Sequence, residues 1–584
     1  MTSLCRSAFK LLVISRIVGT FCVLTVMSLI MPACSRGPDD RLQLKKGESV
    51  VFIGNTFAER MHLFGYFETL LHSSYPDHQL KVRNMGWSGD ELTLRPRPKN
   101  FGDLHKYLRQ EQADVIFACF GMNESFAGPQ GLGEFQQNLD SLIKDIQGQQ
   151  YNGKSAPRIV LVSPIAHENL SDSLPDSTEH NNSLKLYTEV MSKEARRLGL
   201  IFVDLFQPTR EMSSPGMALT FNGIHLTENG YWTISQMVGR SLGLIGTIDS
   251  PVQSGNTTAE RLRRIIYEKN YYFFIRWRGP NGEYIHGERN KMAGAENLRQ
   301  EMEEFDQIVE AYDQKIWGMV KPKPEQVWQQ VPVNRPVWFP TPKYKEVLTN
   351  QVSFGRDEGK RMLPPLEALR TLRVPTGYSV NLYASEEDFP LANPMALNFD
   401  AQGRLWVANT PTWPQPVPGQ QPADSIVILE DTDHDGAADR HTVFIDKLNM
   451  IHGFALGDSG AYIAQTPHLI HAQDTDGDNR ADRVSMLLHG FGSEDVEHSM
   501  NNFKWGPGGA FYFMEGIFFH TQVETPYGPR RLRNAGVFRY KPRLHRLDVA
   551  VSYPFWNPWG EVFDHWGQPI ILDASSGDYY NMDI

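Results

Sequence analysis

Four short blocks of polar residues carry the groups that nucleophilic and acid–base chemistry uses: a hydroxyl, side-chain amides and an imidazole. They lie at residues 54–57 (GNTF), 84–90 (NMGWSGD), 121–124 (GMNE) and 222–227 (NGIHLT). The first and third blocks directly follow short apolar runs that are typical of buried strands. Parallel sheets bind ligands beyond the carboxyl ends of their strands, so we expect the blocks to meet at one site.

Two acidic loops further along the chain suggest a second kind of chemistry. Both share the spacing D-x-D-x-D-x-x-x-D, and carboxylates at alternate loop positions suit the hard cation Ca²⁺. Neither loop has Glu at its twelfth position, so neither is a complete EF-hand; plain acidic surface turns are the alternative. The candidate calcium ligands are Asp431, Asp433, Asp435 and Asp439 in the first loop, and Asp474, Asp476, Asp478 and Asp482 in the second.

The elements that must position the four blocks alternate between apolar runs and amphipathic stretches. Strands are predicted at residues 50–53, 115–120, 159–162 and 200–203, and helices at 135–146 and 183–198. Short β-branched runs separated by helices predict a doubly wound parallel sheet. We therefore expect an α/β three-layer domain over residues 48–245.

In their order along the chain, the four blocks resemble the SGNH (GDSL-type) hydrolase family of esterases and acylhydrolases. The resemblance implies that Thr56 is the nucleophile and His225 the general base. It also implies that the Gly89 amide and the Asn123 side chain form an oxyanion hole, and that Asn222 stands where an aspartate normally orients the histidine. The implied activity is ester hydrolysis, for example of acyl groups on a carbohydrate, without a cofactor.

Two departures from the family pattern put this activity in question. The usual Gly-Asp-Ser is Gly54-Asn55-Thr56, and the usual Asp-x-x-His runs from Asn222 to His225. Replacing the aspartate of a serine triad by asparagine costs a factor of about 10⁴ because the histidine tautomer is wrong. The sequence fits either a slow hydrolase or a non-catalytic glycan-binding module. Thr56 could also simply cap the following helix.

The last third of the chain changes to short strands separated by glycine turns. A strand-turn-strand unit recurs four times, with turn glycines at Gly403, Gly460, Gly509 and Gly567. Units at this spacing predict an all-β propeller over residues 371–584, and four units without a capping signal suggest an incomplete one.

This part resembles the propeller of bacterial putative membrane-bound dehydrogenases, and its fusion to an SGNH-like domain resembles an arrangement of planctomycete-type bacteria. The resemblance raises a third hypothesis, in which a quinone cofactor would bind near His452, His498 and Trp559. We disfavour it, because a single histidine in a strand is more often a packed residue.

Composition and the N-terminus indicate where the protein works. The chain has 584 residues, and its net charge of −11 argues against nucleic-acid binding. With only four cysteines, a disulfide scaffold is excluded. A basic start followed by an apolar run predicts a signal segment at residues 1–34, with Cys34 as a candidate lipidation site. We therefore expect an extracytoplasmic, membrane-anchored protein of a bacterium.

Between the two domains we expect a helical extension at residues 255–320 and a Pro-rich connector at 321–370. The extension holds an aromatic cluster, which fits either a sugar-stacking surface or a helical cap packed on the first domain. Its members are Tyr271, Tyr272, Phe273, Phe274, Trp277 and Tyr284.

Overall fold

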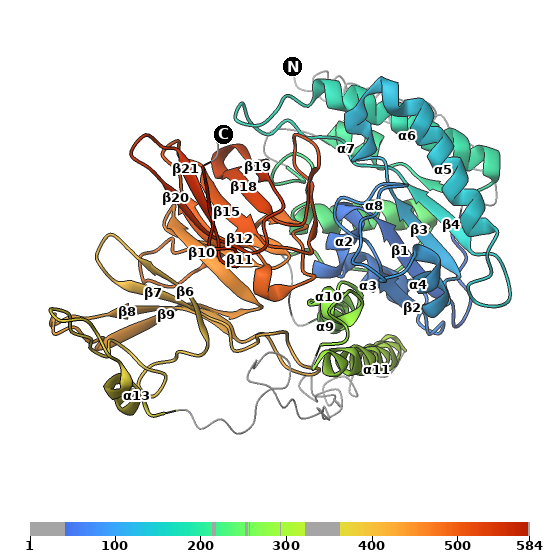
Figure 1. Ribbon diagram of the computed structural model, residues 1–584. Helices are drawn as coiled ribbons and strands as arrows, with labels where there is room; N and C mark the ends of the chain where they lie inside the picture. The colour runs from blue at the N-terminus through green and yellow to red at the C-terminus, as the bar shows by residue number, and fades with distance from the viewer. Residues whose placement is uncertain are drawn as a thin grey trace, which may run out of the picture. The chain divides into compact units, whose positions relative to one another are not determined.

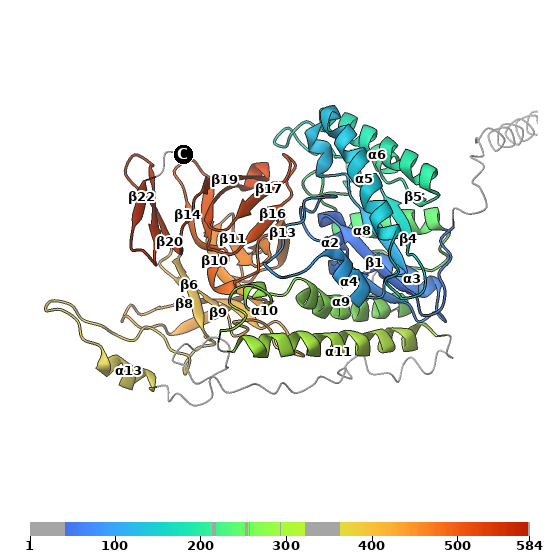
Figure 2. The same ribbon diagram turned by 45° about the vertical axis from the view of Figure 1, so that its right-hand side comes forward.

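The structure is a computed structural model that describes residues 41–212, 218–251, 255, 257–292, 294–321 and 363–581 (Figures 1 and 2). The predicted signal segment, Cys34 and most of the predicted connector lie outside these residues. Residues from Leu42 onward belong to one compact unit. Within the described part of the chain, no helix is both long enough and apolar enough to cross a membrane.

The first domain is built on a five-stranded parallel sheet, which confirms the predicted doubly wound α/β fold. Its order is β2-β1-β3-β4-β5. The strands are β1 (Ser49–Gly54), β2 (Lys81–Asn84), β3 (Val115–Cys119), β4 (Arg158–Val162) and β5 (Ile201–Val203).

Helices cover both faces of this sheet, and the central strands β1, β3 and β4 therefore carry consecutive apolar residues rather than alternating ones. Val51 and Ile53 of β1 face one core, while Val50 and Phe52 face the other. The helices are α2 (Thr56–Arg60), α3 (Tyr66–Ser74), α4 (Leu104–Gln110), α5 (Leu132–Gln147), α6 (Thr178–Leu198), α7 (Phe206–Met212) and α8 (Glu228–Leu242).

A helical extension packs beside β2. It consists of α9 (Thr258–Trp277), α10 (Gly282–Ile285) and α11 (Ala295–Val320). Asp313 of α11 forms a two-point ion pair with Arg83 of β2, at 3.1 and 2.5 Å. Lys269 of α9, fully buried, donates to the Val82 carbonyl at 2.9 Å. Four of the six clustered aromatics lie in the core that α9 and α11 share with the sheet, as the cap interpretation requires: Tyr272, Phe273, Trp277 and Tyr284.

The second domain follows α13 (Pro365–Thr371) and consists of small antiparallel sheets in a propeller-like ring, as predicted (Figure 1). Its sheets hold β6 (Pro394–Phe399), β7 (Leu405–Asn409), β8 (Asp424–Glu430) and β9 (Arg440–Leu448); then β10 (Ile451–Gly457), β11 (Gly460–Gln465), β12 (His468–Gln473) and β13 (Arg483–His489); then β14 (Asn501–Trp505), β15 (Phe511–Glu515), β18 (Gly536–Lys541) and β19 (Arg546–Ser552); and finally β20 (Pro558–Phe563), β21 (Pro569–Asp573) and β22 (Tyr579–Asn581).

The third of these sheets carries an extra hairpin between β15 and β18. It is formed by β16 (His520–Val523) and β17 (Arg530–Arg533), which pair antiparallel (Figure 2). Its residues make hydrogen bonds to the loop after β2, at Gly89 and Asp90. The hairpin therefore joins the β-rich domain to the α/β domain.

A buried charged cluster forms a second junction between the domains. Glu59 of α2 accepts from Arg278 Nη1 at 2.5 Å, from the Ser88 amide at 2.6 Å and from the Ser88 hydroxyl, and it lies 2.7 Å from His489 Nε2 of β13. Burial alone would raise the pKa of Glu59, but Arg278 and His489 hold it well below its usual value. The carboxylate therefore stays ionised between two domains.

Replacing Glu59 by glutamine should destabilise the protein strongly, because it leaves the buried Arg278 without its counter-charge. Breaking such a buried pair costs about 3–5 kcal/mol. Urea unfolding of wild type and Glu59→Gln measures the loss. Glu288→Gln, which breaks the exposed Lys99–Glu288 pair at 2.5 Å, is the matched control and should barely change stability. Equal effects of the two substitutions would contradict a role for the buried cluster.

Candidate functional site

Three of the sequence blocks meet at the carboxyl ends of β1, β2 and β3, and the fourth joins them from the turn before α8. The structure places Thr56 at the first position of α2, Gly89 in the turn after β2 and Asn123 after β3. His225 lies in a turn closed by a bridge between Thr220 and Leu226. The side chains of Thr56, Asn123 and His225 are all buried.

Three N–H donors from these blocks converge on one oxygen atom. The donors are the Thr56 amide at 3.0 Å, the Gly89 amide at 3.1 Å and Asn123 Nδ2 at 2.9 Å. Donors at these distances are what an oxyanion hole needs to stabilise the charge of an acyl-transfer transition state. The oxygen that they hold is Oε1 of Glu524, which directly follows β16 in the β-rich domain.

Gly89 belongs to the hole for steric reasons as well as for its amide. Its φ of +73° is in the left-handed region, where residues with a side chain are strained. A Cβ at this position would lie 2.4 Å from Cβ of Gln522 in β16. Only glycine allows the hairpin to approach the hole this closely.

Asn222 fixes His225 in the wrong protonation form for a general base. Oδ1 of Asn222 accepts from the backbone amides of Ile224 at 3.3 Å and His225 at 3.0 Å, so its amide nitrogen must face the ring. That nitrogen lies 3.0 Å from His225 Nδ1 and donates to it. Burial lowers the pKa of His225, so the ring is neutral and carries its proton on Nε2.

Thr56 does not cap helix α2, contrary to one expectation from the sequence. The cap is Asn55, whose Oδ1 accepts from the Phe57 amide at 3.1 Å. Among the described residues, the Thr56 hydroxyl and His225 Nε2 are buried without a hydrogen-bond partner. The hydrogen bond between nucleophile and base that general-base catalysis requires is therefore not formed in this arrangement.

Glu524 is the site residue that the sequence did not reveal. Its Oε2 lies 3.6 Å from His225 Nε2, so the protonated nitrogen faces the carboxylate. Glu524 is separated from Thr56 by 468 positions, and nothing around it has a catalytic pattern. The only available signal was the extra length between two strands of one propeller sheet, where the hairpin is inserted.

The acidic loops bring six of their eight aspartates together in two groups of three. Asp431, Asp433 and Asp439 form one group, and Asp474, Asp476 and Asp482 the other; in each, one carboxylate oxygen per residue lies within 4.8 Å of the others. Asp435 and Asp478 instead accept hydrogen bonds from backbone amides in their own loops. The six grouped carboxylates fit the oxygen-rich surroundings that Ca²⁺ prefers.

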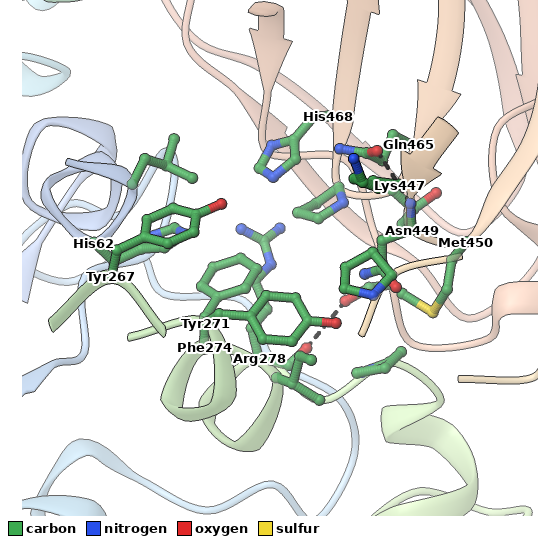
Figure 3. Close-up of a pocket in the computed structure, with 17 residues that line it drawn as sticks. His62, Tyr267, Tyr271, Phe274, Arg278, Lys447, Asn449, Met450, Gln465 and His468 are labelled. Atoms are coloured by element: carbon green, nitrogen blue, oxygen red, sulfur yellow. Dashed lines mark hydrogen bonds between the residues drawn. The ribbon is translucent and has the colours of Figure 1, made fainter. Parts of the chain in front are cut away.

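The cavity in Figure 3 has a volume of about 150 Å³ and is lined by α9, by the β-rich domain and by His62 and Leu63 of the α/β domain. Two aromatics of the cluster line it, together with His468 and Asn449: Tyr271, which also packs against the edge of the core, and Phe274. The sugar-stacking interpretation is therefore restricted to these two rings.

The residues considered for a quinone site do not share one environment. His452 and His498 are buried, and His498 Nδ1 lies 3.0 Å from Asp495. Trp559 is 39% exposed on β20. Exposure therefore distinguishes Trp559 from the two histidines.

Calcium should raise the melting temperature of the full chain if the two loops bind it, because a ligand that binds only the folded state stabilises that state. Thermal unfolding with Ca²⁺ and with a chelator measures the shift. The paired substitutions Asp431→Asn and Asp474→Asn should abolish it, whereas Asp435→Asn, outside both groups, should not. A shift that survives the paired substitutions would contradict binding at these loops.

Acid should weaken the Glu524 contact. Burial alone would raise the pKa of Glu524, but His225 and the donors from Thr56 and Asn123 lower it overall; Arg60 is the neighbouring cation. The ionised carboxylate therefore contributes stability above the unfolded-state pKa of about 4.3, which is lost as the pH falls below that value.

The measurement is urea unfolding of wild type and Glu524→Gln at several pH values. The stability difference between them should be constant down to about pH 5 and shrink below about pH 4. A difference that grows on acidification would show that Glu524 is not held as a carboxylate.

Comparison with known proteins places the two domains in families. Residues 57–233 match the model of the GDSL-like lipase/acylhydrolase family, and residues 364–582 match a family described as a domain of unknown function. No curated protein matched the chain.

Several solved structures are similar over 35% of this chain. A gut microbial diltiazem-metabolizing enzyme is 20% identical with a TM-score of 0.29, and the match spans about half (49%) of its length. An acetylxylan esterase from Geobacillus stearothermophilus is 19% identical, with a TM-score of 0.27 and 98% of its length covered. A GDSL-like lipase from Parabacteroides merdae is 19% identical, with a TM-score of 0.29 and full coverage. The chain thus contains a GDSL-like lipase/acylhydrolase domain at residues 57–233, followed at residues 364–582 by a β-rich domain with a propeller-like arrangement.

Proposed function

We propose that this protein hydrolyses ester bonds in its GDSL-like domain, with Thr56 as nucleophile and His225 as general base. The observation that carries the proposal is the convergence of three N–H donors, within 3.1 Å, on one oxygen beside Thr56. Packing alone does not require three N–H donors directed at one point. An acyl-transfer reaction does, because they stabilise the negative charge on the carbonyl oxygen in its transition state.

In the proposed reaction, the Thr56 hydroxyl attacks the ester carbonyl and the carbonyl oxygen becomes negatively charged in the hole. His225 takes the hydroxyl proton and returns it to the departing alcohol. Water then attacks the acyl-threonine with the same base, releasing a carboxylic acid and restoring Thr56. Acylated carbohydrates are the substrate class that we would test first.

The proposed reaction is slow for a reason visible in the contacts of His225. Its Nε2 must be free of a proton to act as a base, yet the Asn222 amide favours the form that carries a proton there. Turnover therefore proceeds from the minor tautomer. The methyl group of Thr56 adds crowding that serine would not have.

The second candidate function is non-catalytic binding, and a specific observation favours it. A carboxylate already occupies the hole, and every donor there faces it. In that case the domain retains the cleft of a hydrolase and uses it to hold an acidic group of its own chain or of a glycan.

We also propose that the protein works outside the cytoplasm, anchored to a membrane through Cys34. The basic and apolar N-terminal sequence supports this proposal. Metabolic labelling with a lipid precursor tests it, and Cys34→Ala should abolish the label.

Replacing Asn222 by aspartate should raise ester hydrolysis, because a carboxylate would accept the Nδ1 proton of His225 and leave Nε2 free. In a serine triad the reverse change, from aspartate to asparagine, lowers the rate about 10⁴-fold. The increase in rate from Asn222→Asp should therefore not exceed about 10⁴-fold. Thr56→Ser should add to it, and the double variant should exceed the product of the single effects because the two groups act as one unit.

The measurement is turnover of aryl acetates by the full-length variants, each also made with Glu524→Ala so that the hole is open. His225→Ala in every background should abolish the activity. If wild type is active and both single variants are slower, the Asn-Thr pair is an adapted mechanism. If no variant turns over an ester, the binding function replaces the hydrolase.

A further inference from the structure

The carboxylate of Glu524 is bound as a ligand rather than merely packed at a domain boundary. Oε1 accepts from the Thr56 amide, the Gly89 amide and Asn123 Nδ2. Oε2 faces His225 Nε2 at 3.6 Å. The glutamate is only 2% exposed. A charge buried this deeply is stable only where polar groups compensate the lost water, and the three donors to Oε1, with the His225 ring beside Oε2, provide that compensation.

The hairpin that carries Glu524 is fixed to the α/β domain on the other side of the hole as well. Arg531 of β17 donates to the Gly89 carbonyl at 2.8 Å and to Glu91 at 2.5 Å. Gln522 of β16 donates to Asp90 at 3.3 Å. These contacts hold the same turn whose Gly89 amide binds Glu524, so the hairpin and the hole fit together as one unit.

The amide at Asn222 suits this occupant. With Nδ2 directed at the ring, His225 presents an N–H to the carboxylate instead of a lone pair. An aspartate at position 222 would place a second negative charge on the other side of the His225 ring from Glu524. The substitution that impairs a catalytic triad therefore favours the binding of an anion.

We propose that the three donors and the facing His225 ring form a carboxylate-binding site whose resident ligand is Glu524, and that this ligand holds the β16–β17 hairpin on the α/β domain and excludes ester substrates. Small monocarboxylates such as acetate should occupy the site when Glu524 is removed. Carboxylate binding stands independently of turnover, whereas substrate exclusion rests on the proposed hydrolase function.

An ester and Glu524 cannot occupy the hole together, because both need the same donors for one oxygen. Only molecules in which the hairpin is displaced can then bind an ester, so the measured activity of wild type equals the activity of the open form multiplied by the fraction of such molecules. Removing the side chain removes that factor, so the open variant should bind esters without first separating the domains.

The first test is rescue of full-length Glu524→Ala by acetate. The variant should melt below wild type, and acetate should raise its melting temperature in a saturable manner. Acetamide, which has the same shape without the charge, and chloride should not. Wild type should not respond, because its site is filled.

Glu515→Ala is the matched control. Glu515 is a fully buried glutamate of the same domain that accepts from Thr521 and not from the hole. Its loss should not be rescued by acetate. Equal rescue of both variants, or none in Glu524→Ala, would overturn the carboxylate site.

If Glu524→Ala fails to fold, Glu524→Gln keeps the proposal testable. Its oxygen can still accept from the three donors, but its amide N–H₂ would oppose the N–H of His225. Hydrogen exchange of the Thr56 and Gly89 amides should then be faster than in wild type, while the amides of β3 stay protected. Unchanged exchange at Thr56 and Gly89 would overturn the proposal.

The second test compares turnover of an aryl acetate by wild type and Glu524→Ala. The open variant should be faster by about tenfold or more, as expected when the competent state is a minor one. Acetate rescue without turnover in any variant would support the carboxylate site and remove the hydrolase function. Turnover equal to wild type, together with rescue, would overturn the exclusion of substrate.

Discussion

A negative charge cannot be buried in a protein without donors, and this constraint organises the contact between the two domains. Glu59 and Glu524 are both buried there, and each is matched by groups from the opposite domain. The two carboxylates cross the domain boundary in opposite directions. Glu59 of the α/β domain reaches His489 of the β-rich domain, whereas Glu524 of the β-rich domain reaches Thr56. Each domain thus buries one anion that a group of the other domain contacts.

The three donors around Glu524 are well suited to meet this constraint, because they are in place before any ligand arrives. Backbone amides at Thr56 and Gly89 are held by the start of α2 and by a tight turn, so they need not reorganise to receive a carboxylate. A catalytic device for stabilising transient charge is, by the same geometry, a receptor for permanent charge. The replacement of aspartate by Asn222 moves the site further toward that second use.

The sequence predicts the parts of this molecule that depend on local or periodic patterns. The apolar runs at β1, β3 and β4 identified the sheet, and the four turn glycines identified the strand pairs of the β-rich domain. The blocks around Thr56 and His225 identified a common site because strand ends converge in a parallel sheet. Glu524 could not be found this way, because its role depends on the contact between two domains. No periodic pattern in the sequence predicts which residues form that contact. The same holds for the choice of Asn55 over Thr56 as helix cap, which depends on backbone angles.

The position of Glu524 late in the chain has a consequence for biosynthesis. Its codon is translated about 300 residues after that of His225, which corresponds to about 15–60 s at ordinary rates of protein synthesis. Any α/β domain that folds on the ribosome in this interval does so with water in the hole and with Thr56 accessible. A nascent chain that folds in this way has an open site until the β16–β17 hairpin is synthesised and Glu524 fills the site.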